Sequence, residues 1–252
     1  MIYNLDMENY VNEIRTLIEN AKSIVFFGGA GVSTESGIKD FRSKDGLYRL
    51  HSKYGKPYEV MLSHGYFEEN VDTFYEFYKE FMITNAKPND AHKFLAFLEN
   101  VKHKKVTIIT QNIDGLHQMA GSKNVIELHG SINRNYCVNC GKEFSLDYIK
   151  NSKGTPRCDK CGGIIKPDVV LYEEPLDDYA ITKAMIALQE ADLLIVAGTS
   201  LKVYPAASFI NYFYGDNIIV INKEKLELNR KVKLEITAPI GETFKKVQNL
   251  MK

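Results

Sequence analysis

Short apolar runs alternate with longer segments whose apolar positions recur at helical spacing along most of this chain. Buried β-strands have runs of this kind, and amphipathic helices place apolar residues three to four positions apart. The expected strands are residues 23–27, 106–110, 125–128, 168–171, 192–197 and 217–221. The expected helices are residues 6–20, 66–83, 88–100, 177–190 and 205–214. Strands that alternate with helices predict an α/β fold: a Rossmann-like, mostly parallel sheet with helices on both faces.

Residues 135–166 interrupt this pattern, because they hold all the cysteines and several glycines but few residues of the buried type. The segment is therefore expected to be a small insert with its own means of stability. We expect the Rossmann-like domain to comprise residues 1–44, 86–134 and 167–252. Insertions would form a small zinc-ribbon/helical domain, with a helical part at 45–85 and a zinc-binding ribbon at 135–166.

The net charge and the hydropathy of the chain argue against nucleic acid and membranes as binding partners. The chain has 32 basic and 32 acidic residues, so no surface for nucleic acid or an anionic membrane is expected. No apolar run is long enough to span a bilayer, and the N-terminal residues lack the pattern of a signal peptide. We therefore expect a cytoplasmic protein that binds neither nucleic acid nor membrane. The oligomeric state is unknown, with a monomer favoured.

Small and hydrogen-bonding residues follow the expected strands at positions 28–31, 110–112, 129–130, 198–200 and 222. Ligands of parallel sheets bind beyond the carboxyl ends of the strands, so this set predicts one cleft. Each segment alone is an ordinary turn. The glycines at 28–31 would let backbone N–H groups approach a pyrophosphate, with a helix N-terminus behind them.

The glycine-rich segment departs from the usual dinucleotide fingerprint. After Gly29 and Gly31 the next glycine is Gly37, and no expected strand ends in the acidic residue that usually binds the adenosine ribose. This counts against a hydride-transferring dehydrogenase but leaves a bound dinucleotide open.

The cysteines form two Cys-x-x-Cys pairs, each followed by a glycine. The pairs are Cys137 with Cys140, and Cys158 with Cys161. Four thiolates suit a closed tetrahedral zinc site, in which the ion is structural rather than catalytic. Disulfides are the alternative, but they are rare in the cytoplasm. The sequence therefore predicts one structural Zn²⁺.

Several motifs occur in the order typical of one family. They are GAGVS at 29–33, GIKDFRS at 37–43, TQNIDGLH at 110–117, ELHG at 127–130, the cysteine pairs, GTSL at 198–201 and VYPAA at 203–207. Over residues 21–224 the chain resembles the sirtuins, which are NAD-dependent protein-lysine deacylases. The resemblance implies that NAD is a consumed co-substrate and that acetylated proteins or peptides are the partners. The implied products are nicotinamide, O-acetyl-ADP-ribose and deacetylated lysine.

The resemblance also assigns roles by position. His129 is the expected general base, a task for which imidazole has a suitable pKa, and Asn112 would order water and the ribose at the reacting carbon. Asp114 and the Ile113 backbone would hold the nicotinamide carboxamide, and Gln111 would contact the ribose. The other expected NAD contacts are Gly29, Ala30, Gly31, Thr34, Phe41, Arg42, Gly198, Thr199, Ser200, Asn222 and Ile240. The peptide is expected to add as a strand along Val169, Val170, Leu171 and Tyr172.

Three departures from the family pattern bear on rate and substrate preference rather than on reaction type. Gly28 replaces the usual threonine, and Lys39 replaces the usual proline of the cofactor loop. Residues 172–174 read Tyr-Glu-Glu where the family usually has Phe-Gly-Glu, which adds bulk and charge beside the peptide.

The expected acyl group is uncharged. Sirtuins that remove acidic acyl chains carry a Tyr-x-x-Arg pair on the helix of the small domain. Here Tyr78 occupies the position of that arginine, so a buried acyl carboxylate would lack a guanidinium partner. Lys79 is the adjacent residue and leaves a cation nearby.

Two alternative functions remain open at this point. A protein mono-ADP-ribosyltransferase would also release nicotinamide from NAD, but it would do so without an acyl-lysine peptide. A non-catalytic, NAD-sensing zinc-ribbon binding module would bind NAD without turnover.

Overall fold

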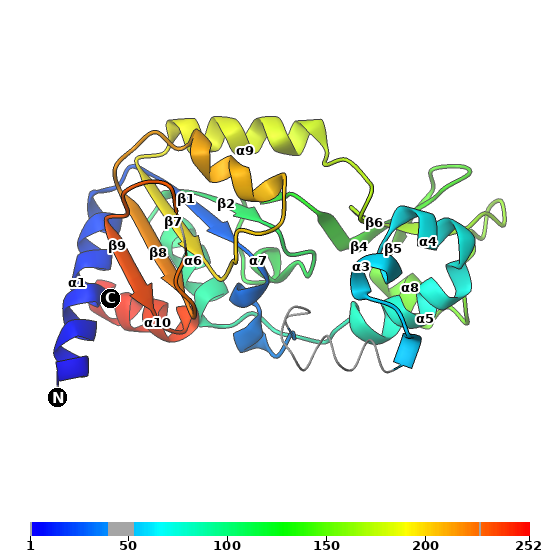
Figure 1. The fold of residues 1–252 in the computed structure, drawn as a ribbon, viewed down its shortest axis with the longest axis horizontal. Helices are drawn as coiled ribbons and strands as arrows, with labels where there is room; N and C mark the ends of the chain where they lie inside the picture. Colours follow the sequence, from blue (N-terminus) through cyan, green and yellow to red (C-terminus); the bar gives the residue numbers. More distant parts are fainter. Residues whose placement is uncertain (1, 40–52, 227) are drawn as a thin grey trace.

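The computed structural model describes residues 2–39, 53–226 and 228–252 of the chain. The described residues form a larger lobe around one sheet and a smaller lobe that lies beyond the ends of some of its strands (Figure 1). The smaller lobe combines helices that precede residue 82 with a ribbon that follows residue 129. Segments far apart in the sequence thus meet in it.

The larger lobe contains a six-stranded parallel sheet with the order β3-β2-β1-β7-β8-β9. Its strands are β1 (Ser23–Gly28), β2 (Lys105–Thr110), β3 (Val125–Glu127), β7 (Leu193–Ala197), β8 (Ile218–Asn222) and β9 (Leu234–Thr237). The chain moves outward from β1 to β3, returns to the other side of β1, and then moves outward to β9. Ligands of such sheets bind where the order reverses, here between the ends of β1 and β7.

Successive strand residues enter two different cores, as the two-residue period of a strand requires. Phe26 lies on a face that packs against α1 (Ile2–Asn20), α6 (Asp90–Asn100) and α10 (Ile240–Met251). Phe27 lies on the opposite face, which packs against α9 (Asp178–Glu190) and the 3₁₀ helix η3 (Ala206–Tyr212). The predicted α/β fold with helices on both faces is confirmed.

The smaller lobe has an antiparallel sheet with the order β5-β4-β6. Its elements are α3 (Tyr58–Met61), α4 (His64–Glu69), α5 (Val71–Phe81), β4 (Gly130–Cys137), β5 (Glu143–Ser145), α8 (Leu146–Asn151) and β6 (Ile165–Val169). Phe74 and Phe77 of α5 share one apolar core with Phe144 and Ile165 of the ribbon. The ribbon is therefore packed on the helices.

The predicted strand at 168–171 is misplaced. The strand is β6, which ends at Val169 and pairs antiparallel with β4 in the smaller lobe, outside the parallel sheet. A short apolar run does not specify its partner, and here the connection through the two cysteine pairs brings β6 against β4. The sequence pattern also missed β9 and α10.

The helix expected behind the glycine-rich turn is also wrong. The segment forms two single-turn 3₁₀ helices, η1 (Ala30–Val32) and η2 (Thr34–Ser36), and ends at Gly37 with a φ of 83°. Glycine, serine and threonine are poor helix formers, and a left-handed glycine terminates the turn. No α-helix N-terminus follows β1 in residues 29–39.

Two other predicted helices differ in detail. The helix expected at 66–83 is divided into α4 and α5 at Asn70, whose backbone is non-helical. The segment expected at 205–214 is the 3₁₀ helix η3. The spacing of apolar positions cannot distinguish an interrupted helix or a 3₁₀ helix from one regular α-helix, because that spacing is nearly the same in all three.

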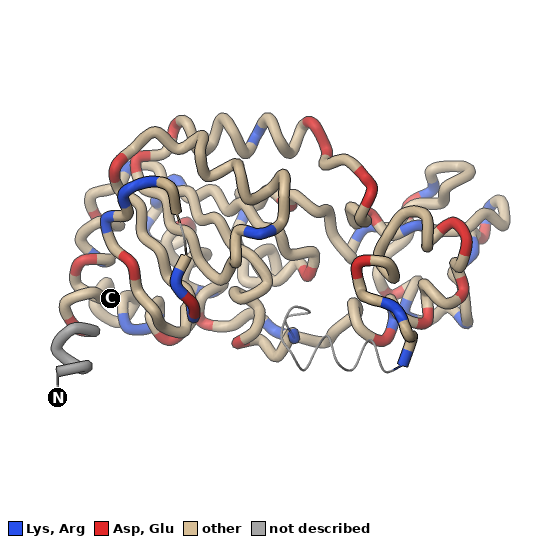
Figure 2. Tube along the Cα trace, viewed as in Figure 1, with Lys and Arg blue, Asp and Glu red and all other residues tan. Residues whose placement is uncertain are grey.

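Charged residues of both signs are interspersed along the trace of both lobes (Figure 2). This distribution agrees with the balanced composition of the chain. Among the described helices, none combines the length and the apolar character needed to cross a membrane.

Candidate active site

Two glycine-containing loops meet where the strand order reverses. The Gly31 N–H donates to the Gly198 carbonyl oxygen at 2.7 Å. A Cβ on Gly198 would lie 2.4 Å from the Val32 nitrogen, and one on Gly31 would lie 2.8 Å from the Gly198 Cα. Gly198 also has a φ of 59°. Only glycine allows this approach. Ligands of such sheets bind beyond these strand ends, and we call this region beyond β1 and β7 the crevice.

Ser33 joins two polar side chains from the segment after β2. Its hydroxyl donates to Asp114 Oδ2 at 2.6 Å and accepts from Asn112 Nδ2 at 3.0 Å. Asp114 Oδ1 accepts the Leu116 N–H at 2.9 Å. Burial raises the pKa of Asp114, and the hydrogen bond from Ser33 opposes that rise. The three side chains form one hydrogen-bonded unit in the crevice.

His129 lies between β3 and β4, with Nδ1 2.9 Å from the Gln111 carbonyl oxygen. A carbonyl oxygen only accepts, so Nδ1 carries the proton and Nε2 is the nitrogen able to accept one in the neutral ring. The Gln111 side chain donates to Thr199 Oγ1 at 3.2 Å. These contacts connect the ends of β2, β3 and β7 around the crevice.

Gly130 fixes the path of the chain directly after His129. Its φ is 73°, and a Cβ there would lie 1.9 Å from the Asp168 carbonyl oxygen. Any side chain at this position would therefore separate β4 from β6.

Several of the remaining expected NAD contacts lie on three other segments of the chain. Gly29, Ala30 and Thr34 lie in the loop after β1, where the Thr34 hydroxyl donates to the Gly31 carbonyl. Ile240 begins α10, and its Cδ1 lies 2.9 Å from the point that a Cβ on Gly198 would occupy. Asn222 instead bonds within its own loop, to the Glu224 carbonyl.

Other expected residues lie on the rim or outside the described chain. Ser200 is exposed beside the buried Thr199. The Ile113 carbonyl accepts the Ile132 N–H at 3.0 Å. Phe41 and Arg42 lie outside the described residues.

The segment expected to receive the peptide runs between the two lobes. Val169 and Leu171 are buried, and the Val170 N–H donates to the His129 carbonyl at 3.0 Å. The Tyr172 backbone binds the smaller lobe through Leu62 and His64. An open groove of about 440 Å³ borders Val169 and Val170. The segment is therefore attached to both the expected base and the helices of the smaller lobe.

Glu173 adopts a φ of 78°, a conformation natural to the glycine that the family usually has here. Its carboxylate accepts the Gly65 N–H at 2.9 Å. The neighbouring Glu174 accepts from His64, Lys166 and the Leu171 N–H. These acidic side chains hold the segment after β6 against α4.

Two residues that the sequence analysis did not select complete the site. Ser33 stood inside the GAGVS motif, but its partners at 112 and 114 are known only from the fold. Asn89 donates from Nδ2 to the Val32 carbonyl at 2.7 Å and caps α6. Its position before an amphipathic helix signals a cap, not a contact with the loop after β1.

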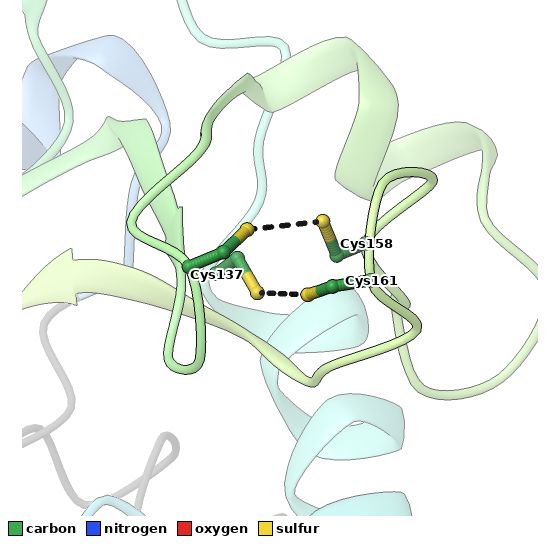
Figure 3. A group of neighbouring side chains, drawn as sticks. Cys137, Cys158 and Cys161 are labelled. Atoms are coloured by element: carbon green, nitrogen blue, oxygen red, sulfur yellow. Dashed lines mark hydrogen bonds between the residues drawn. The ribbon is translucent and has the colours of Figure 1, made fainter.

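The four cysteine sulfurs converge from two turns of the ribbon (Figure 3). The Sγ atoms of Cys137 and Cys161 are 3.4 Å apart, those of Cys140 and Cys158 are 3.7 Å apart, and all four lie within 4.8 Å of one another. Sulfurs bound at 2.3 Å to a tetrahedral zinc ion are separated by about 3.8 Å. The donor set and its spacing fit such an ion.

His92 of α6 and His117 form a buried imidazole pair. Their ring centroids are 4.6 Å apart, and the side chains are 0% and 1% exposed. Nε2 of His92 and both ring nitrogens of His117 have no hydrogen-bond partner among the described residues. Burial lowers the pKa of His92 to about 4 and, together with the charge of His92, that of His117 to about 3. The pair therefore packs as part of the protein core.

Acidification is expected to destabilise the fold through this pair. Both folded-state pKa values lie below the unfolded value, so the unfolded chain binds more protons as pH falls through about 6.5 and stability is lost. The linkage predicts a loss of about 3 kcal/mol between about pH 7.5 and 5.5. Urea unfolding at the two pH values measures it.

A His117→Leu variant controls for other titrating groups, including the cysteines, because it removes one imidazole and leaves the rest. It is expected to lose about half as much stability as the parent over the same range. An unchanged pH dependence in the variant would contradict a role for the imidazole pair.

The reversed strand order, the hydrogen-bonding side chains at the strand ends and the four-cysteine ribbon define an α/β protein of the kind that binds ligands at the switch point, with a cysteine-ribbon lobe. Within that class the chain belongs to the Sir2 family, whose sequence profile matches residues 29–205.

Named relatives are similar in sequence to this chain over nearly its whole length. The NAD-dependent protein deacetylase of Clostridium acetobutylicum is 56% identical over 239 residues, which cover 94% of this chain and 97% of the relative. The protein of the same name from Clostridium perfringens is 54% identical over 243 residues, with 96% and 99% covered. A solved structure of Sir2 with a p53 peptide and NAD⁺ has a TM-score of 0.81 at 36% identity, with 95% of this chain and 97% of that chain covered.

Proposed function

We propose that this chain is an NAD-dependent protein-lysine deacetylase that consumes NAD and releases nicotinamide and O-acetyl-ADP-ribose. The observation that carries the proposal is the cluster of polar side chains beyond the ends of β1, β2 and β3. It holds an imidazole with a defined tautomer beside the hydrogen-bonded unit of Ser33, Asn112 and Asp114. The names of the relatives and the peptide and NAD⁺ in a structural neighbour support the same activity.

The proposed roles follow from the hydrogen-bonding capacity of each group. Asp114 supplies carboxylate acceptors for a carboxamide NH₂, and Ser33 keeps Asp114 and Asn112 oriented. Bound NAD supplies the ribose carbon at which nicotinamide is lost. His129 accepts a proton at Nε2 from a ribose hydroxyl, while the Gln111 carbonyl holds the opposite nitrogen. The side chains near the loop after β1 would contact the phosphates and adenosine.

We also propose that Cys137, Cys140, Cys158 and Cys161 hold one structural zinc ion. The convergent sulfurs support four thiolate ligands with no open position. A cytoplasmic location is proposed with it, because cysteines that remain reduced thiolates are typical of that compartment. A monomer stays the favoured oligomeric state. The ion would stabilise the ribbon and take no part in the reaction.

The direct test is to incubate the protein with NAD and an acetyl-lysine peptide and to quantify nicotinamide and O-acetyl-ADP-ribose. Equal amounts of both products are expected, and only when peptide is present. Nicotinamide release without peptide, with ADP-ribose attached to protein, would favour a mono-ADP-ribosyltransferase. NAD binding without any turnover would favour a binding module.

Uncharged acyl groups are the proposed substrates. Lys79 is committed elsewhere, because its Nζ donates to the Ser152 carbonyl and hydroxyl and to the Gly154 carbonyl at the end of α8. Tyr75 and Tyr78 are buried in the core of the smaller lobe, 1% and 0% exposed. The two tyrosines carry no positive charge and Lys79 is already bonded, so none of the three residues supplies a cation for an acyl carboxylate.

Deacetylation is accordingly expected to exceed desuccinylation by about 100-fold in kcat/KM, since an unpaired carboxylate loses its hydration on entering an apolar site. Parallel assays with acetyl, butyryl and succinyl peptides of one sequence measure this. The butyryl peptide controls for chain length and is expected to be accepted better than the succinyl peptide. Succinyl removal that matches or exceeds acetyl removal would refute the preference.

A further inference from the structure

Arg134 binds two carboxylates that come from different segments. Its Nη1 donates to Glu127 Oε2 at 2.7 Å, and its Nε donates to Asp168 Oδ2 at 2.7 Å. The Glu127 side chain is only 9% exposed and also accepts from Gln118. Hydrogen bonds between ionised partners at this distance are among the strongest in proteins.

The two carboxylates flank the segment that contains His129. Glu127 is the last residue of β3, two positions before His129. Asp168 lies in β6 opposite Ser131, two positions before Val170, whose N–H donates to the His129 carbonyl. The backbone of His129 is thus bonded to Val170, and Arg134 binds a carboxylate two positions before each of these two residues.

An irregularity in the ribbon gives Arg134 access to both partners. The register between β4 and β6 shifts between Ser131 and Asn135, so residues 132–134 have no regular partner on β6. A β-bulge of this kind redirects a side chain. From this position the guanidinium reaches β3 in the larger lobe and β6 in the smaller lobe.

We propose that Arg134 is a positioning residue that holds the base His129 and the peptide segment after β6 in a fixed relation. The inference rests on the proposed deacetylase function. The planar fork of arginine binds two carboxylates in fixed directions, whereas lysine is a single flexible point charge. Loss of the fork would let the peptide segment and His129 move independently. Misplacement of reacting groups by about 1 Å is enough to reduce a rate by about 100-fold.

The test compares the Arg134→Gln and Arg134→Lys variants with the parent. It measures KM for acetyl peptide and for NAD, kcat for O-acetyl-ADP-ribose formation, and nicotinamide exchange at saturating peptide. In Arg134→Gln, kcat/KM for the peptide is expected to fall by about 30- to 100-fold. KM for NAD should stay within about twofold, because the loop after β1 is not among the contacts of Arg134. Product formation should fall more than nicotinamide exchange, because only the former needs the base.

The conservative and control variants separate positioning from general stability. Arg134→Lys keeps the charge and is expected to recover part of the activity, with values between those of Arg134→Gln and the parent. Lys142→Gln breaks the ion pair with Asp159 in the same ribbon and should leave all the parameters unchanged. Melting temperature and metal content are measured for each variant.

The outcomes distinguish this inference from the proposed function. An active parent with an equally active Arg134→Gln variant would overturn the role of Arg134 alone. A variant in which NAD and peptide KM worsen equally, with a lower melting temperature, would show a structural role and overturn it too. An inactive parent would refute the deacetylase proposal and with it this inference.

Discussion

Replacing His129 with alanine is expected to reduce deacetylation by about 1,000-fold or more, with the fold and metal content retained. Positioned general bases contribute roughly 10²- to 10⁴-fold, and no other imidazole of the described chain lies in the crevice. The alanine loses the hydrogen bond to the Gln111 carbonyl, and a single hydrogen bond contributes about 1 kcal/mol to stability. The measurement is O-acetyl-ADP-ribose formation at saturating NAD and acetyl peptide, beside circular dichroism and metal analysis.

Two comparisons sharpen this test. Nicotinamide exchange should persist in His129→Ala, because nicotinamide leaves before the base is needed. His103→Asn is the matched control: His103 is exposed and has a φ of 53°, which asparagine tolerates. That variant should keep full activity. Deacetylation by His129→Ala at a rate near that of the parent would contradict the assignment of the base.

Removing the proposed zinc ion is expected to unfold the ribbon and abolish activity. Binding of structural zinc by four ligands is worth about 10–16 kcal/mol, comparable with the whole stability of a domain. Ile165 and Phe144 share their core with α5, so loss of the ribbon would also release the peptide segment after β6. The effect is indirect, because the eight-residue strand β4, which rises about 3.3 Å per residue, begins directly after His129 and ends at Cys137.

Native mass spectrometry, and melting with and without a strong chelator, measure this effect. A Cys158→Ser variant is expected to show the same loss as the chelator, and added Zn²⁺ should restore the chelated parent but not the variant. A parent that carries no metal and melts at the same temperature in chelator would refute the structural ion.

The sequence determined the parts of this protein that depend on local patterns. Apolar runs predicted five of the six strands of the parallel sheet, including all four inner ones, because strands buried on both faces are nearly continuous runs of apolar residues. The Cys-x-x-Cys spacing predicted the sulfur cluster, since each turn presents both of its thiols on one side. The ordered motifs predicted the family, which the match over residues 29–205 established.

The tertiary structure decided what depends on contacts between distant segments. Residues 168–171 could not reveal their partner, because pairing with β4 is selected by the ribbon connection and the shared core. Ser33 and Arg134 are a serine in a loop and an arginine on a strand until the fold brings them to Asp114 and to Asp168. Hydrogen bonds and ion pairs act over about 3 Å, whereas their partners are separated by dozens of positions in the chain. Only the packed structure specifies which of them meet.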